Sequence, residues 1–138
     1  MTDNETIKQV YNDALASEQR GDNSDAIALY KKAISLGAKD VAVFLNLSLL
    51  YRQASQYNDA IAVLNDALQL NEEDKSKTLD IARVYNNLGN VYRSQGAYDK
   101  AIQSFEKALS LDSSMSGPNL NIGITYDVHL NQSANMSN

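Results

Sequence analysis

Residues 85–112 read YNNLGNVYRSQGAYDKAIQSFEKALSLD, and this stretch decides the fold because other parts of the chain repeat it. Its second half, GAYDKAIQSFEKALSLD at 96–112, matches GDNSDAIALYKKAISLG at 21–37 and SQYNDAIAVLNDALQLN at 55–71. The matched alanines Ala26, Ala60 and Ala101 are 34 and then 41 residues apart. A unit of 34 residues therefore recurs, with one insertion of seven residues between the second and third copies.

The first half of the stretch recurs with the same unit length. Leu47, Leu88 and Ile122 occupy one position, and Tyr51, Tyr92 and Tyr126 follow four residues later. The residue directly after the leucine position is small in these three copies: Ser48, Gly89 and Gly123. Small residues at such a position let two helices cross closely.

These positions resemble the tetratricopeptide repeat, a helix–turn–helix unit of 34 residues. The third copy is nearly a full match and carries Tyr85, Leu88, Gly89, Tyr92, Gly96, Ala101, Phe105 and Ala108. The proline that usually closes the unit is replaced by Ala38, Glu72 and Ser113. The resemblance implies an all-α fold, a right-handed superhelical solenoid of antiparallel helix pairs with about 3.5 units. The repeats are expected near 7–40, 41–74 and 82–115, with a half repeat at 116–130, in one domain over 1–130.

Helix boundaries follow from the apolar spacing and from three glycines. We expect helices near 4–20, 24–36, 41–54, 57–70, 74–95, 98–111 and 117–130, and a disordered tail over 131–138. Gly21, Gly37 and Gly96 stand just after periodic segments, where a left-handed residue ends a helix. Asp40 is expected to cap the helix that follows it.

Two segments leave alternatives open. The insertion within NEEDKSKTLDIARVY favours a fifth helix that starts about two turns early, because seven residues are nearly two turns; a longer charged loop is the alternative. The last element has Leu120, Ile122, Ile124 and Tyr126 at alternate positions, which is typical of a strand. Its alignment with the earlier copies favours a helix.

Composition argues against several classes of function. The formal net charge of −5 disfavours nucleic acid and anionic membranes as partners, because both select basic surfaces. The chain has no cysteine and one histidine, His129, without a visible catalytic partner. We therefore expect no enzyme activity, no catalytic residues, no metal site and no cofactor. The N-terminal sequence has no apolar signal segment, and we expect a cytoplasmic protein.

An asparagine directly precedes the leucine position in all four copies, as Asn12, Asn46, Asn87 and Asn121. Asparagine is a mediocre helix former, so helix propensity does not explain this series. In the resembled family this position faces a concave groove, where an amide can pair with the backbone of an extended peptide. The alternative is that these asparagines form hydrogen bonds within the solenoid. The other groove positions implied by the resemblance include Lys8, Tyr11, Leu45, Leu49, Arg52, Arg83, Asn90 and Arg93.

The resemblance therefore implies a protein–protein interaction module, an adaptor or scaffold, that binds a peptide segment of a protein partner in its groove. Relatives that bind chaperone tails hold a carboxylate with a clamp of basic and asparagine residues. Here Tyr11 and Leu15 stand at the positions of the first lysine and asparagine of that clamp, so chaperone tails are not predicted as partners. The alternative function is self-association, a homo-oligomer formed through the incomplete C-terminal repeat.

Overall fold

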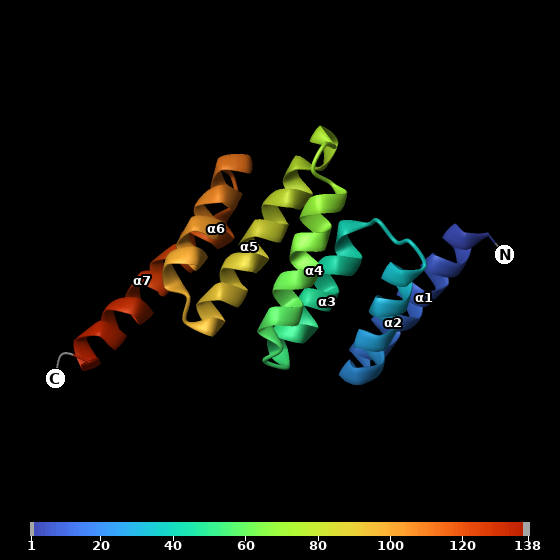
Figure 1. Cartoon of the computed structure of the whole chain (residues 1–138), viewed down its shortest axis with the longest axis horizontal. Helices are drawn as coiled ribbons and strands as arrows, with labels where there is room; N and C mark the ends of the chain where they lie inside the picture. The colour runs from blue at the N-terminus through green and yellow to red at the C-terminus, as the bar shows by residue number, and fades with distance from the viewer. Residues whose placement is uncertain (1, 137–138) are drawn as a thin grey trace. The chain divides into compact units, whose positions relative to one another are not determined.

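The computed structural model describes residues 2–136 and is built from helices, with no strand in that range. Seven α-helices lie within that range, and Figure 1 labels them in chain order. Their bounds, with those of one short 3₁₀ helix, are α1 Asp3–Gln19, α2 Asn23–Ser35, α3 Val41–Gln53, α4 Tyr57–Leu70, η1 Lys75–Lys77, α5 Thr78–Gln95, α6 Tyr98–Leu111 and α7 Ser116–Met136. The expected all-α fold of helix pairs is confirmed.

The helices form two compact units, Met1–Leu70 and Asn71–Asn138. In the first unit α1 packs against α2, α3 against α4, and α2 also contacts α3. In the second unit α5 packs against α6, and α7 packs mainly against α6 and also contacts α5. The expectation of one domain over 1–130 with the stated repeat boundaries stays a prediction.

Each helix pair is centred on a small residue of its first helix. A Cβ atom added to Gly89 of α5 would lie 2.5 Å from Cδ1 of Phe105 on α6, well inside van der Waals contact. In the second copy, Ser48 and Leu64 occupy the repeat positions of Gly89 and Phe105. In the first copy, Ala14 and Tyr30 occupy them. The five side chains are at most 1% exposed and Gly89 is also buried, so the crossing is the buried centre of each pair.

Four of the turns between consecutive helices share one geometry. Gly21, Gly37 and Gly96 have φ between 81° and 103°, which confirms their predicted left-handed conformation. Ser55 takes the same role with φ 61°, a conformation that costs a non-glycine residue about 1–2 kcal/mol. The amide of the following residue closes each turn, as when Gln56 N donates to Tyr51 O at 2.8 Å.

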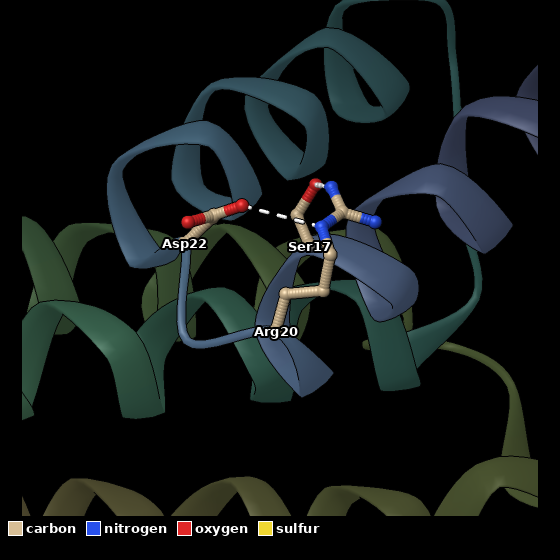
Figure 2. A network of polar contacts seen from close by, with 3 residues as sticks. All are labelled: Ser17, Arg20 and Asp22. Carbon is tan, nitrogen blue, oxygen red and sulfur yellow. Dashed lines mark hydrogen bonds and ion pairs between the residues drawn. The ribbon is translucent and has the colours of Figure 1, made fainter.

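A polar cluster holds the first of these turns in place (Figure 2). Arg20 Nη2 donates to Ser17 Oγ at 3.1 Å, and Arg20 Nε lies 3.2 Å from Asp22 Oδ2. Ser17 is buried at the end of α1, whereas Asp22 directly precedes α2. The guanidinium group therefore bridges the two ends that the turn must bring together.

The start of the fifth helix needs correction in detail, whereas the expected C-terminal helix is confirmed. The insertion forms η1, whose N-cap Asp74 accepts from Ser76 N, and α5 begins at Thr78; the expected α-helix from 74 is thus a 3₁₀ turn followed by an α-helix. The hydroxyl group of Ser76 also donates to Asp74. This hydrogen bond and the one from the Ser76 amide lower the pKa of the Asp74 carboxyl group. The C-terminal element is a helix, so the strand alternative is wrong.

The last helix is also longer than expected. α7 reaches Met136, so residues 131–136 are helical where a disordered tail over 131–138 was expected. Residues 137 and 138 of that predicted tail lie outside the described residues. The helix begins with Pro118 in its first turn, where a missing N–H is tolerated.

We predict that Gly89→Ala destabilises the second unit. The added methyl group must displace the buried Phe105 ring, and overpacking of this kind typically lowers the free energy of unfolding by about 1–3 kcal/mol. Urea unfolding followed by circular dichroism measures the change. Phe105→Leu, which copies the residue found in the second repeat, should recover part of the loss in the double variant.

Gly123→Ala is the matched control for this prediction. Gly123 occupies the same repeat position in α7, but an added Cβ there would meet nothing within 4 Å. Alanine should therefore raise the stability of α7 by up to about 1 kcal/mol through helix propensity alone. Equal effects of the two substitutions would show that the close crossing does not govern stability at this position.

Candidate functional site

The predicted site residues all lie on the first helices of the pairs. Tyr11 and Asn12 are on α1, and Leu45, Asn46, Leu49 and Arg52 are on α3. Arg83, Asn87, Asn90 and Arg93 are on α5, and Asn121 is on α7. Most of them are half-buried, and Asn12, Leu49 and Arg83 are exposed. Leu45 is only 5% exposed, so its side chain belongs to the core of the first unit and offers little surface to a ligand.

In the first unit, Asn46 is engaged by a neighbouring first helix. Asn46 Nδ2 donates to Tyr11 Oη at 3.3 Å, from α3 to α1. The Tyr11 ring lies 6.0 Å from the buried Tyr30 ring, and Tyr30 Oη donates to Glu18 Oε1 at 2.9 Å. A chain of polar and aromatic contacts thus joins α1, α2 and α3, and Asn46 is part of that chain.

In the second unit, Asn121 has an equivalent partner. Asn121 Nδ2 of α7 donates to Asn86 Oδ1 of α5 at 3.1 Å. Asn46 and Tyr11 are 35 residues apart, and so are Asn121 and Asn86. The same hydrogen bond therefore recurs in both units: the asparagine of one first helix donates to the residue before the corresponding asparagine of the preceding first helix.

The other two asparagines are not held in this way. Asn12 is exposed on α1 and Asn87 is half-buried on α5, and within residues 2–136 neither side-chain amide has a hydrogen-bond partner. The four-membered series therefore divides into two asparagines that join helices and two whose amides are available. Sequence alone left both interpretations open. The hydrogen bonds of Asn46 and Asn121 agree with a role within the solenoid for those two, and peptide binding by the series stays a prediction.

The side-chain amide of Asn90, in the second unit, lacks a hydrogen bond to its buried oxygen within the described residues. The Oδ1 atom of Asn90 on α5 is buried and accepts no hydrogen bond within the part of the chain that the structure describes. A buried acceptor without a donor costs about 1–3 kcal/mol.

Arg83, on the same helix, lies 3.8 Å from Asp80 as an exposed ion pair. Such pairs contribute little to stability, so Arg83 remains able to exchange its partner.

The first unit has a pocket of about 550 Å³ beside Asn12. Its lining residues come from α1, from the loop between α2 and α3, and from the first turn of α3: Asn4, Ile7, Lys8, Tyr11, Asn12, Gly37, Ala38, Lys39, Asp40 and Val43. The repeat positions identified only the α1 part of this wall. Lys39 was missed because it lies in a loop, where the repeat pattern assigns no facing direction.

No group of three or more histidine, cysteine, aspartate or glutamate side chains in residues 2–136 is arranged to hold a metal ion. Within the same range, the helices are too short or too polar to cross a lipid bilayer.

Burial of Tyr30 gives a prediction for alkaline pH. Burial raises the pKa of this phenol, and its hydrogen bond to Glu18 raises the pKa further. The folded state then keeps a proton that the unfolded chain releases above its pKa of about 10, so the free energy of unfolding should fall by about 1.4 kcal/mol per pH unit above that pH. Below pH 10 the stabilising contribution of the protonated Tyr30 phenol is fully present.

Tyr30→Phe should remove that contribution to the slope. Unfolding by urea at a series of pH values from 8 upwards, compared between wild type and Tyr30→Phe, measures it. A constant offset between the two proteins across the series would mean that the phenol of Tyr30 ionises equally in both states, contrary to the prediction. Tyr51, whose pKa burial also raises, is present in both proteins and cancels in the comparison.

Comparison with known proteins agrees with the helix-pair fold. The sequence profile of the tetratricopeptide repeat matches residues 40–114, more than half of the 138-residue chain. Curated proteins give no significant sequence match. Among solved structures, the TPR2AB domain of yeast Sti1 in a pHSP90 complex superposes with a TM-score of 0.83 at 20% identity, over 96% of this chain and 51% of that chain.

Two further structures match over nearly their whole length. The N-terminal domain of stress-induced protein-1 from C. elegans has a TM-score of 0.79 at 17% identity, over 91% of this chain and 98% of its own. The second TPR domain of human RPAP3, in complex with the HSP70 peptide SGPTIEEVD, has a TM-score of 0.78 at 15% identity, over 91% and 98%. At these identities the likeness establishes the fold.

Proposed function

Because the chain belongs to the tetratricopeptide repeat family, we propose that it is a protein-interaction module that binds an extended peptide segment of a partner protein. The peptide lies on the faces of the first helices, where the predicted groove residues are. The observation that carries this proposal is the division of the asparagine series: Asn12 and Asn87 have side-chain amides without partners in the described residues, one in each unit.

The chemistry of these two amides suits a peptide backbone. A carboxamide group donates through its NH₂ and accepts through its oxygen, so it can pair with both polar groups of a peptide unit whatever the side chains are. Asn46 and Asn121 contribute differently, because their amides already donate to Tyr11 and Asn86. They are proposed to fix the first helices that carry the two available amides.

Neighbouring side chains support a peptide with both apolar and acidic residues. Leu49 is exposed on α3, and Arg52 lies one turn further along the same face. Arg83 and Arg93 add positive charge on α5. In a chain of net charge −5, cations gathered on the first helices favour an acidic ligand.

The partner is not proposed to be a chaperone tail. The RPAP3 domain described above binds an HSP70 peptide, but its identity to this chain is 15%. Tyr11 and Leu15 occupy the positions where the clamp of chaperone-binding relatives places its first lysine and asparagine. Neither a phenol nor a leucine side chain supplies the charge that a terminal carboxylate needs.

We predict that Asn12→Ala and Asn87→Ala each weaken peptide binding. Loss of the hydrogen bonds from one amide should lower affinity by about two- to tenfold per substitution, because one such bond contributes about 0.5–1.5 kcal/mol. Ligands are selected from a phage-displayed library of linear peptides on the wild-type protein, and fluorescence anisotropy then measures their affinities for the variants.

Asn65→Ala is the matched control for both substitutions, since Asn65 is exposed on the second helix α4. It should leave peptide affinity unchanged. Asn46→Ala should instead lower the free energy of unfolding by about 1 kcal/mol, because it removes the hydrogen bond to Tyr11. If the selected peptides bind wild type, Asn12→Ala and Asn87→Ala equally well, the two asparagines do not contribute to peptide binding.

Self-association through α7 is a second candidate function, and one observation favours it. α7 exposes large apolar side chains, with Leu120 at 66% and Leu130 at 62% exposed and Tyr126 also exposed. Gly123, whose counterpart Gly89 is covered by Phe105, has open space above it. A second copy of the chain could cover these residues by packing its own α7 against them, because such a patch is unfavourable in water.

If α7 forms that contact, the wild-type protein should show a mass that rises with concentration in sedimentation experiments. Leu130→Asp should then keep the protein monomeric, because a buried carboxylate without a partner disfavours the interface. Leu79→Asp on α5 is the control, since Leu79 is also 62% exposed. Wild-type protein that stays monomeric at every concentration would count against this function.

A further inference from the structure

The pocket beside Asn12 combines an apolar wall with two positive charges. Ala38 and Val43 are buried and form part of its wall, and Ile7 is half-buried beside them. Lys8 and Lys39 are exposed residues that line the same pocket from α1 and from the loop before α3. Within residues 2–136 neither lysine forms an ion pair.

One negative charge also lines the pocket, and it is already engaged. Asp40 Oδ1 accepts from Ala42 N at 3.0 Å and so caps the N-terminus of α3. The partial positive charge of that helix terminus further balances the carboxylate. The charged side chains of the lining are therefore Lys8, Lys39 and Asp40, with an excess of one positive charge in a chain whose net charge is −5.

We propose that this pocket binds an apolar side chain of a peptide ligand together with the acidic side chain next to it. The apolar side chain packs against the half-buried Ile7 and Tyr11, behind which Ala38 and Val43 are buried, and the carboxylate lies between Lys8 and Lys39. The proposal rests on the peptide-binding function proposed above, because Asn12 at the edge of the pocket would hold the intervening peptide bond.

The size and charge of the pocket support this ligand. A volume of about 550 Å³ lies within the range of roughly 300–1,000 Å³ that is typical of small-ligand sites, so more than one side chain can enter. An apolar wall alone would accept any hydrophobic residue. The two unpaired ammonium groups add a preference for a neighbouring carboxylate, and that preference should weaken with salt because both lysines are exposed.

The test titrates ¹⁵N-labelled full-length protein with blocked dipeptides and follows amide chemical shifts. Acetyl-Leu-Glu-amide should shift the amides of residues 37–40 and of the first half of α1. Acetyl-Leu-Gln-amide has the same shape without the charge and should bind about two- to twenty-fivefold more weakly, since two exposed ion pairs contribute about 1.4- to fivefold each. Acetyl-Gly-Glu-amide, which lacks the apolar side chain, should also bind more weakly.

Paired variants assign the preference to these lysines. Lys8→Gln/Lys39→Gln should bind the Glu and Gln dipeptides equally, whereas Lys31→Gln/Lys32→Gln should keep the difference. The control removes the same charge from exposed lysines of α2 that do not line the pocket. Equal binding of the Glu and Gln dipeptides by wild type, or shifts that fall elsewhere in the chain, would overturn the proposal.

A further arm separates an acidic side chain from a chain terminus. If acetyl-leucine with a free carboxylate binds more tightly than acetyl-Leu-Glu-amide, the pocket takes a C-terminal carboxylate and the proposal as stated is wrong. Because the dipeptides are followed at individual amides, this experiment reports on the pocket alone. The Asn12 and Asn87 variants report on the peptide-binding function separately, so either can fail without the other.

Discussion

The close crossing of paired helices at one small residue is the constraint on which the rest of this structure depends. On α5 that residue is Gly89, and the Phe105 ring of α6 fills the space that a Cβ atom would need. A larger residue would push the two helices apart, and interiors packed at crystal-like density absorb such shifts poorly. The crossing also fixes the rotation of the first helix, and this rotation decides which of its side chains face the core and which remain available.

The division of the four asparagines follows from that fixed rotation. All four stand one residue before the same leucine position and therefore face in equivalent directions on their helices. Within each unit, the asparagine of the later first helix meets an acceptor on the earlier first helix. Tyr11 and Asn86 have oxygen atoms that accept from Asn46 and Asn121, so those two amides contribute to packing between helices. A position that recurs with the repeat can thus form a hydrogen bond between helices in one copy and none in another.

The sequence could predict the fold because the copies of the repeat can be aligned with one another within the same chain. The spacing of Ala60, Leu64 and Ala67 placed α4 at its observed bounds, and the three turn glycines have their predicted conformation. Ser55 was not foreseen as a left-handed residue, since only glycine adopts this conformation freely. The tail was misjudged over 131–136, because polar composition argues for disorder but does not exclude continuation of a helix that α6 already supports.

The site was less predictable, and the reason is geometric. Repeat positions tell which face of a helix a residue occupies, but the hydrogen bonds that decide between structure and binding join residues 35 positions apart. Lys39 illustrates the same limit, because it reaches the pocket from a loop whose course is set by Gly37 and by the capped start of α3. The pocket brings this loop beside Lys8 and Asn12 of α1, so its lining is a property of two neighbouring repeats together and cannot be read from either repeat alone.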